Sequence, residues 1–153
     1  MASSLNVYPS LSGIAVSEIF TGYPLTMKQS SKKIALIAHD KKKSELLAWV
    51  LANKEELATH ELIATGTTGK LIAKESGLPV QLVESGPYGG DIQIGAEMVE
   101  NRIHALIFFW DPLEPQPHDP DVKALLRVSV LKNIPTASNR ATADLLIHSK
   151  FFN

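Results

Sequence analysis

Beyond residue 31 the sequence predicts an α/β fold, a three-layer α/β/α sandwich around a five-stranded parallel sheet. Short runs of aliphatic and β-branched residues alternate there with longer segments in which apolar residues recur at helical spacing. Strands that alternate with helices favour right-handed crossovers, and therefore parallel strands with helices on both faces. The run Ala105–Phe109 contains no polar residue, as is typical of a strand covered on both sides. Rossmann and flavodoxin-like domains have this architecture.

Each predicted strand is a short aliphatic run that ends at polar or glycine-containing residues. In chain order the strands are Ile34–Ala38, Leu62–Ala64, Val80–Val83, Ala105–Phe109 and Pro135–Ala137. The segments between and after them are predicted helices, namely Lys43–Leu57, Gly69–Ser76, Asp91–Glu100, Asp119–Leu131 and Asn139–Ile147. In the first helix we expect Leu46, Trp49 and Val50 on the buried face. In the fourth, Asp119 is expected as the N-cap and Pro120 as the first helical residue.

The length of the chain suits a single domain with its own core, since 44% of its 153 residues are hydrophobic. Residues 1–31 differ from the rest, because they hold no lysine or arginine before Lys28 and show no lasting periodicity. We expect them to be a loosely ordered tail, partly non-native, with Met27 as a candidate natural start. Residues 32–153 are predicted to form the one folded domain.

The composition excludes several classes of function. Fifteen basic and sixteen acidic residues give a net charge of -1, which favours neither nucleic acid nor an anionic membrane as a partner. The absence of cysteine excludes disulfides, thiolate catalysis and cysteine-ligated zinc or iron–sulfur centres. No run is long enough to span a bilayer and no secretory signal is visible, so we expect a cytoplasmic protein.

Polar and glycine-rich segments follow four of the predicted strands. They are His39-Asp40, Thr65–Gly69, Ser85–Asp91 and Trp110–Asp121. Because ligands of open parallel sheets bind beyond the carboxyl ends of the strands, these segments should converge on one site.

Thr65–Gly69 is a turn of small and hydroxylated residues between a strand and a helix. Glycine lets the backbone approach a ligand, and the amides of a helix N-terminus attract an anion, so the turn favours phosphate binding. An ordinary turn with a threonine N-cap is an equally good interpretation. The segment matches neither dinucleotide nor nucleoside-triphosphate motifs, which lowers the expectation of those ligands.

Ser85–Asp91 contains more glycine than a connection of this kind requires, which suggests a loop shaped around a ligand. Asp91 at its end has two interpretations. It is either the N-cap of the following helix or a general base for a substrate C–H bond.

Trp110–Asp121 combines four prolines, which stiffen a loop, with Asp111, His118 and Asp121. A histidine flanked by carboxylates can move a proton between two oxygens of a substrate. The same side chains could hold a metal, but their spacing matches no metal motif, so no metal is expected.

Two residues near the first strand are further candidates. His39 follows a buried strand and is either a structural histidine or a ligand contact, while Lys43, one turn later, is placed to return toward the site. His60, His104 and His148 lie outside these segments and are expected to be structural or exposed.

Four blocks of the sequence resemble the methylglyoxal synthase family. They are IAHD (37–40), ATGTTG (64–69), SGP with GGD (85–91) and FFWDPLEPQPHDPDVKALLR (108–127). The resemblance covers residues 32–153, and four blocks in the same order make it specific.

The resemblance implies a lyase that converts dihydroxyacetone phosphate into methylglyoxal and inorganic phosphate without a cofactor or a metal. Asp91 matches the base that takes a proton from the substrate carbon, and His118 the histidine that moves protons between the enediolate oxygens. Asp111 and Asp121 match further active-site carboxylates. The positions that hold the substrate and its phosphate match His39, Lys43, Thr65, Gly66, Thr67, Thr68, Ser85, Gly86 and His118.

The resemblance also concerns assembly and regulation. Family members form hexamers, so a homo-oligomer is expected. They usually continue beyond the motif that ends here in Phe151-Phe152-Asn153, with a helix linked to regulation by phosphate, so we expect that regulation to be missing. Related domains serve as effector-binding modules of larger enzymes, which is the alternative function. A third alternative, an interaction domain without a ligand, leaves the polar strand ends unexplained.

Overall fold

Five parallel strands form the centre of the structure, a computed structural model that describes residues 30–153. The strands are β1 (Lys33–Ala38), β2 (Glu61–Thr65), β3 (Gln81–Val83), β4 (Ala105–Phe109) and β5 (Thr136–Ala137). Their order in the sheet is β3-β2-β1-β4-β5. This order is that of a doubly wound α/β fold, and the predicted three-layer architecture is confirmed.

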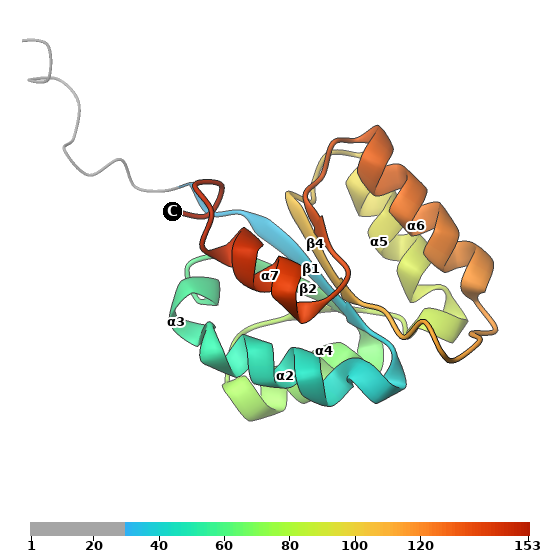
Figure 1. Cartoon of the computed structure of the whole chain (residues 1–153), viewed down its shortest axis with the longest axis horizontal. Coiled ribbons are helices and arrows are strands. Elements are labelled where there is room, and N and C mark those ends of the chain that lie inside the picture. Colours follow the sequence, from blue (N-terminus) through green and yellow to red (C-terminus); the bar gives the residue numbers. More distant parts are fainter. Residues whose placement is uncertain (1–29) are drawn as a thin grey trace, which may run out of the picture.

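Helices cover both faces of the sheet (Figure 1). One face carries α2 (Lys43–Ala52), α3 (Lys54–Leu57), α4 (Gly66–Ser76) and α7 (Arg140–Ile147), and the other carries α5 (Gly90–Val99) and α6 (Asp119–Leu131). Two short 3-10 helices, η1 (Asp40–Lys42) and η2 (Gly86–Tyr88), lie in the loops after β1 and β3.

The two layers of core follow from the alternation of side chains along β1. Ile34 and Leu36 point to the face that packs against α2, α3, α4 and α7, whereas Ala35 and Ile37 point to the face that packs against α5 and α6. Both faces are buried, so the strand has no polar residue except at its start. The predicted burial of Trp49 with its helical neighbours is confirmed, since its side chain is almost fully buried.

The structure corrects three local predictions. The predicted helix Lys43–Leu57 is interrupted at Asn53, whose φ of −116° is not helical and whose side chain donates to the carbonyl of Trp49. α6 begins at Asp119, so His118 rather than Asp119 occupies the N-cap position. α5 begins at Gly90, so Asp91 lies within the first turn and is not the N-cap.

The strand order opens a crevice between β1 and β4. The helix after β1 covers one face of the sheet, whereas the helix after β4 covers the opposite face, so the two connections diverge. At such a switch point the loops leave room for a ligand. His39 and the loop that leads to His118 therefore stand on the two sides of this crevice.

At the opposite end of the sheet, two histidines accept hydrogen bonds from the backbone at the start of β1. The backbone N–H groups of Lys32 and Lys33 donate to Nδ1 of His60 and His104, at 3.1 and 2.8 Å. His148, in turn, contacts the carbonyl of Asp144 with its Nδ1. These three histidines lie away from the carboxyl ends of the strands, as the sequence predicted.

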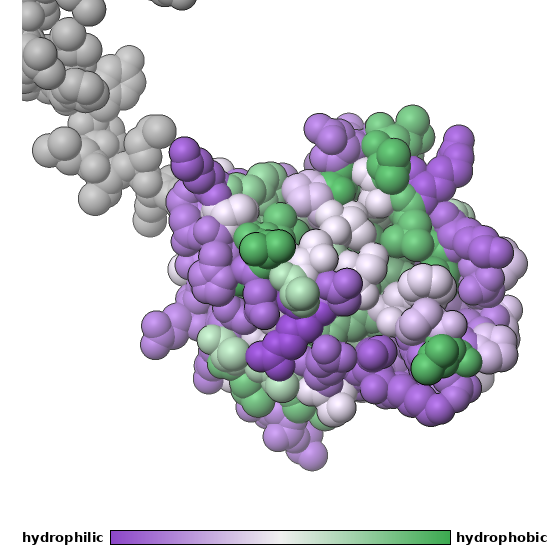
Figure 2. All heavy atoms as spheres, in the orientation of Figure 1, coloured by the Kyte–Doolittle hydropathy of each residue, from purple (hydrophilic) through white to green (hydrophobic). Residues whose placement is uncertain are grey.

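The proposed tail has only its last two residues, 30 and 31, within the described part of the chain, so its predicted order and the start at Met27 lie outside the structure. From residue 30 onward, no helix combines the length and the apolar character needed to cross a membrane. The face in Figure 2 is mostly polar, with apolar groups in scattered patches.

Two glycines of α5 should respond oppositely to alanine. A Cβ at Gly90 would stand 1.9 Å from the carbonyl oxygen of Glu84, whereas a Cβ at Gly95 would meet only Leu125, at 3.9 Å. We expect Gly90→Ala to lower the free energy of unfolding by about 1–3 kcal/mol, and Gly95→Ala to raise it by about 0.5–1 kcal/mol. Urea unfolding measures both, and equal stability of the two variants would contradict the close packing of Gly90.

Candidate active site

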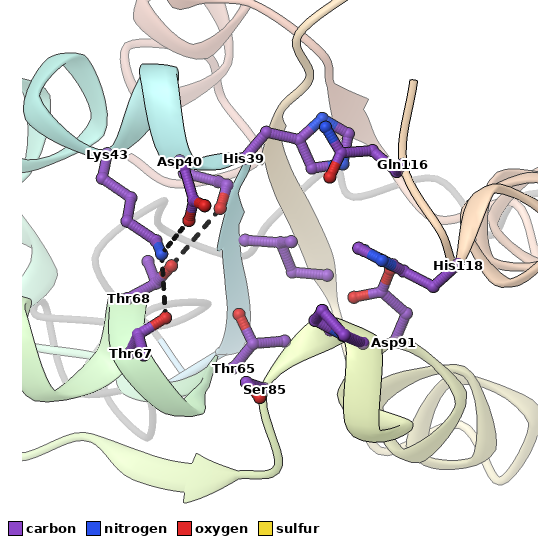
Figure 3. Close-up of a pocket in the computed structure, with 14 residues that line it drawn as sticks. His39, Asp40, Lys43, Thr65, Thr67, Thr68, Ser85, Asp91, Gln116 and His118 are labelled. Atoms are coloured by element: carbon purple, nitrogen blue, oxygen red, sulfur yellow. Dashed lines mark hydrogen bonds and ion pairs between the residues drawn. The ribbon is translucent and has the colours of Figure 1, made fainter. Parts of the chain in front are cut away.

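The carboxyl ends of β1 to β4 surround one small cavity (Figure 3). Its polar lining consists of His39, Asp40, Lys43, Thr65, Thr67, Thr68, Ser85, Asp91, Gln116 and His118. Gly86 and Pro87 also line it. In Figure 3 Lys43, Thr67 and Thr68 stand on one side of the cavity, and Asp91 and His118 on the other. The strand-end segments singled out in the sequence therefore do converge.

One side of the cavity combines a helix N-terminus with a lysine. α4 begins at Gly66, directly after Thr65, and the side chain of Thr65 makes no capping hydrogen bond. Lys43 Nζ donates to Thr67 Oγ1 at 2.8 Å and to Asp40 Oδ1 at 2.5 Å. Positive charge and amide groups thus face the same space, which is the arrangement that binds phosphate.

Asp40 is a counter-ion for this lysine. The hydrogen bond from Lys43 lowers the pKa of Asp40, so its carboxylate stays charged. Its side chain is otherwise exposed. A phosphate that bound Lys43 would therefore compete with a carboxylate that water can readily solvate.

Asp91 is a buried carboxylate on the opposite side. It is 1% exposed, and neither of its oxygens has a hydrogen-bond partner in the structure. His118 Nε2 lies 3.6 Å from Asp91 Oδ2, and His118 Nδ1 is also buried without a partner. Burial raises the pKa of Asp91; the nearby His118 opposes this shift and Asp121 adds to it. Asp91 is thus a stronger base than an exposed aspartate.

Glycines in the loop after β3 let the site close around His118. A Cβ at Gly86 would stand 2.7 Å from His118 Nε2, so the imidazole packs directly on the backbone there. Gly90 passes equally close to Glu84, which lets α5 start immediately beside the loop and places Asp91 in its first turn. Gly86 and Gly90 are needed because neighbouring atoms lie too close to their backbone for a side chain. They do not adopt a left-handed conformation, since only Gly89 in this loop has a positive φ.

His39 joins the cavity from the end of β1. Its Nδ1 accepts the backbone N–H of Asp111 at 3.0 Å, while its Nε2 is buried without a partner. The ring stands edge-on to the rings of Phe108 and His118, with centroids 5.2 and 6.0 Å apart. Burial and the neighbouring His118 lower the pKa of His39, so the ring is neutral near pH 7.

Unpaired polar atoms are concentrated at this cavity. Within residues 30–153, five buried side-chain atoms lack a hydrogen-bond partner, and four of them belong to His39, Asp91 and His118. Each such atom costs about 1–3 kcal/mol when nothing replaces the water it has lost. Their common location indicates that a polar ligand completes the site.

Three residues that the sequence assigned to the site do not line the cavity. Asp111 is buried behind His39, and its Oδ1 accepts the N–H of Leu113 at 3.0 Å. Asp121 is half-buried in the first turn of α6, close enough to affect the pKa of Asp91. Gly66 lies at the start of α4 and packs against the backbone of Val83 and Ser85.

Two polar residues of the lining were not among the predicted site residues. Asp40 directly follows His39 at the end of the same strand, and this position could have predicted that it lines the cavity. Gln116 lies in the proline-containing loop, where nothing in the sequence marks it. In the described part of the chain, no three His, Asp or Glu side chains are gathered as a possible metal site.

The raised pKa of Asp91 is open to a direct test. We expect Asp121→Asn to lower the pKa of Asp91, because a neighbour that raises it is removed, and His118→Gln to raise it, because a neighbour that lowers it is removed. Carboxyl ¹³C NMR titration of the unliganded protein measures both shifts. An Asp91 that titrates like an exposed aspartate in all three proteins would show that the carboxylate is hydrated.

Known proteins resemble this chain in sequence and in structure. The family model described as MGS-like domain matches residues 45–138. Methylglyoxal synthase of Erwinia tasmaniensis is 58% identical over 125 residues, which are 82% of each chain. The protein of the same name from Pectobacterium atrosepticum is 58% identical over 80% of this chain and 81% of its own.

A solved structure agrees with these relatives. The crystal structure of methylglyoxal synthase from Elizabethkingia anophelis superimposes with a TM-score of 0.76, covers 80% of each chain and is 52% identical. The matched segment 45–138 contains the loops that carry Asp91 and His118. On these grounds, the chain belongs to the methylglyoxal synthase family.

Proposed function

We propose that this protein is a lyase that converts dihydroxyacetone phosphate into methylglyoxal and inorganic phosphate. The observation that carries this proposal is the pairing, in one cavity, of a phosphate-type cradle with a buried carboxylate that has no partner. The family of the chain supports the same reaction. The reaction is an elimination, so it needs no redox cofactor.

The phosphate group binds at the N-terminus of α4. The donors are the amides of the first turn after Gly66, whose own N–H donates to the carbonyl of Glu84, and the ammonium group of Lys43. The hydroxyls of Thr65, Thr67 and Ser85 add to them. Such a rigid cradle fixes the direction of the C–O bond to phosphate. That bond breaks readily only when it is aligned with the π electrons of the enediolate. By holding the bond in this direction, the phosphate site favours elimination of phosphate.

Asp91 removes the proton from the hydroxymethyl carbon of the substrate. Its burial supports this role, because a desolvated carboxylate without hydrogen bonds is more basic than one in water. The negative charge moves to the carbonyl oxygen and forms an enediolate. Donors already placed in the cavity stabilise that charge.

His118 moves a proton between the two enediolate oxygens. It stands 3.6 Å from Asp91, and its Nδ1 has no other partner, so both ring nitrogens are available for proton transfer. When the oxygen on the reacting carbon loses its proton, it becomes the aldehyde carbonyl. The C–O bond to phosphate breaks in the same step, and the remaining enol takes up a proton at carbon to give methylglyoxal.

We also propose that the chain forms a homo-oligomer, a hexamer as in its family, and that it acts in the cytoplasm. Large apolar side chains stand exposed on several elements and would be covered in an assembly. They include Leu113, Val130, Leu131 and Leu145.

Turnover of dihydroxyacetone phosphate is the first test. We expect the purified protein to release methylglyoxal and phosphate in equal amounts, with or without a chelator. Asp91→Asn should lower kcat about 100- to 10,000-fold, because the base is lost. Asp119→Asn, a carboxylate of the neighbouring α6 that pairs with Lys123 outside the cavity, is the matched control and should remain active.

Two outcomes would overturn the proposal in different ways. Phosphate binding without turnover would indicate the effector-binding module considered as the alternative function. Activity that disappears with the chelator would indicate a metal-dependent reaction.

Lys43 should contribute mainly to substrate binding. Lys43→Ala removes a charged donor from the phosphate side, so we expect KM to rise about 10- to 100-fold while kcat falls less. Lys42→Ala, whose ammonium group faces Glu45 outside the cavity, is the control. Steady-state kinetics separate the two parameters, and an unchanged KM in Lys43→Ala would remove this lysine from the phosphate site.

A further inference from the structure

Gln116 lines the cavity, yet neither phosphate binding nor proton transfer uses it. Its side chain is half-buried. In Figure 3 it lies on the same side of the cavity as His118, away from Lys43 on the phosphate side. Its amide group therefore stands at the end of the cavity where the substrate reacts.

The backbone of Gln116 is restricted to a narrow range of conformations. Pro115 precedes this residue and Pro117 follows it, and a residue before a proline is largely confined to extended conformations. The carbonyl of Gln116 accepts the N–H of Asp119 at 3.2 Å, where α6 begins. The loop thus presents the side chain from a nearly fixed point, as a selective contact requires.

An ion pair across the crevice supports the same loop. The ammonium group of Lys41, in η1 after β1, contacts the carboxylate of Glu114, although the two residues are 73 positions apart in the chain. Both side chains are exposed, so the pair contributes little free energy by itself. It nevertheless joins the loop, two residues before Gln116, to the segment on the other side of the crevice.

The amide group of Gln116 has free hydrogen-bonding capacity. Within residues 30–153 its side chain makes one hydrogen bond, from Nε2 to the carbonyl of Glu114 at 3.3 Å. That bond is long and exposed, so it is weak. A side-chain amide has two N–H donors and an oxygen acceptor, so one N–H and Oε1 remain for a ligand.

We propose that Gln116 is a specificity-determining residue, whose side-chain amide binds the hydroxyl group on the reacting carbon of the substrate. This inference rests on the proposed function. The substrate extends from the phosphate side near Lys43, and its reacting carbon faces Asp91 and His118. The hydroxyl group on that carbon is the polar group farthest from the phosphate. Gln116 lies two residues before His118 in the same loop and is placed to reach it.

An uncharged amide suits the chemistry at this position. It can donate to the hydroxyl oxygen or accept from the hydroxyl proton, yet it does not itself take up a proton. The hydroxyl group therefore keeps its proton until His118 moves it. Binding the hydroxyl group also restricts rotation of the hydroxymethyl group, which keeps its C–H bond directed at Asp91. The substrate class selected is a phosphate ester of a three-carbon ketone with a free terminal hydroxyl group.

Calorimetry with two phosphate esters tests this contact. Hydroxyacetone phosphate differs from dihydroxyacetone phosphate only in lacking the hydroxyl group. In the Asp91→Asn protein, chosen because its turnover is slow, we expect hydroxyacetone phosphate to bind about 3- to 10-fold more weakly. Gln116→Met in the same background keeps the length of the side chain but removes the amide. It should remove most of this difference by weakening the binding of dihydroxyacetone phosphate alone.

Kinetics of the active enzyme supply the second readout. We expect Gln116→Met to raise KM for dihydroxyacetone phosphate about 3- to 10-fold. Gln81→Met, the same substitution at an exposed residue at the start of β3, is the matched control and should leave KM unchanged. Inorganic phosphate should bind Gln116→Met as tightly as the wild type, because Lys43 and the start of α4 are unaltered.

The outcomes separate this inference from the proposed function. Equal weakening of both esters by Gln116→Met, no weakening of either, or loss of phosphate binding would overturn the selective contact. Equal affinity of the Asp91→Asn protein for the two esters would also overturn it, whether or not the double variant folds. Absence of methylglyoxal formation by the wild type would overturn the proposed function, while the calorimetric comparison would still decide whether Gln116 selects the hydroxyl group.

Discussion

The burial of Asp91 beside two imidazoles is the constraint on which the site depends. Asp91, His118 and His39 each hold polar atoms that have lost water and gained no partner within the described residues. Such atoms weaken the folded state. The strands and helices around them are packed on both faces of the sheet, and this packing offsets the cost. The site therefore holds its groups ready for a ligand that supplies the missing partners.

The doubly wound topology explains why these groups meet. The helices after β1 and β4 cover opposite faces of the sheet, which opens a crevice between these strands. The segments after β1 and β2 bring Lys43 and Thr67 to one side of the cavity, and those after β3 and β4 bring Asp91 and His118 to the other. Lys43 and the N-terminus of α4 attract negative charge, whereas Asp91 stays away from them and retains its basicity. The cavity thus separates its cationic side from its basic carboxylate.

The sequence predicted the strands well because buried parallel strands are uninterrupted apolar runs. It placed Asp91 and His118 in polar segments that follow strands, and in the structure both residues line the same cavity. It could not predict the break at Asn53, which depends on a side chain reaching back to a carbonyl of the preceding turn. Nor could it separate lining residues from supporting ones. The sequence predicted Asp111 as a site carboxylate, but in the fold it lies behind His39, in a turn closed by its contact with the N–H of Leu113.

The most direct measurement is a crystal structure of the Asp91→Asn variant with dihydroxyacetone phosphate bound. We expect the phosphate at the start of α4, bonded to Lys43 and Thr67, with the hydroxymethyl carbon facing the side chain at position 91 and the carbonyl oxygen next to His39 Nε2. A substrate bound outside this cavity, or with that carbon turned away from position 91 and His118, would contradict the proposed chemistry.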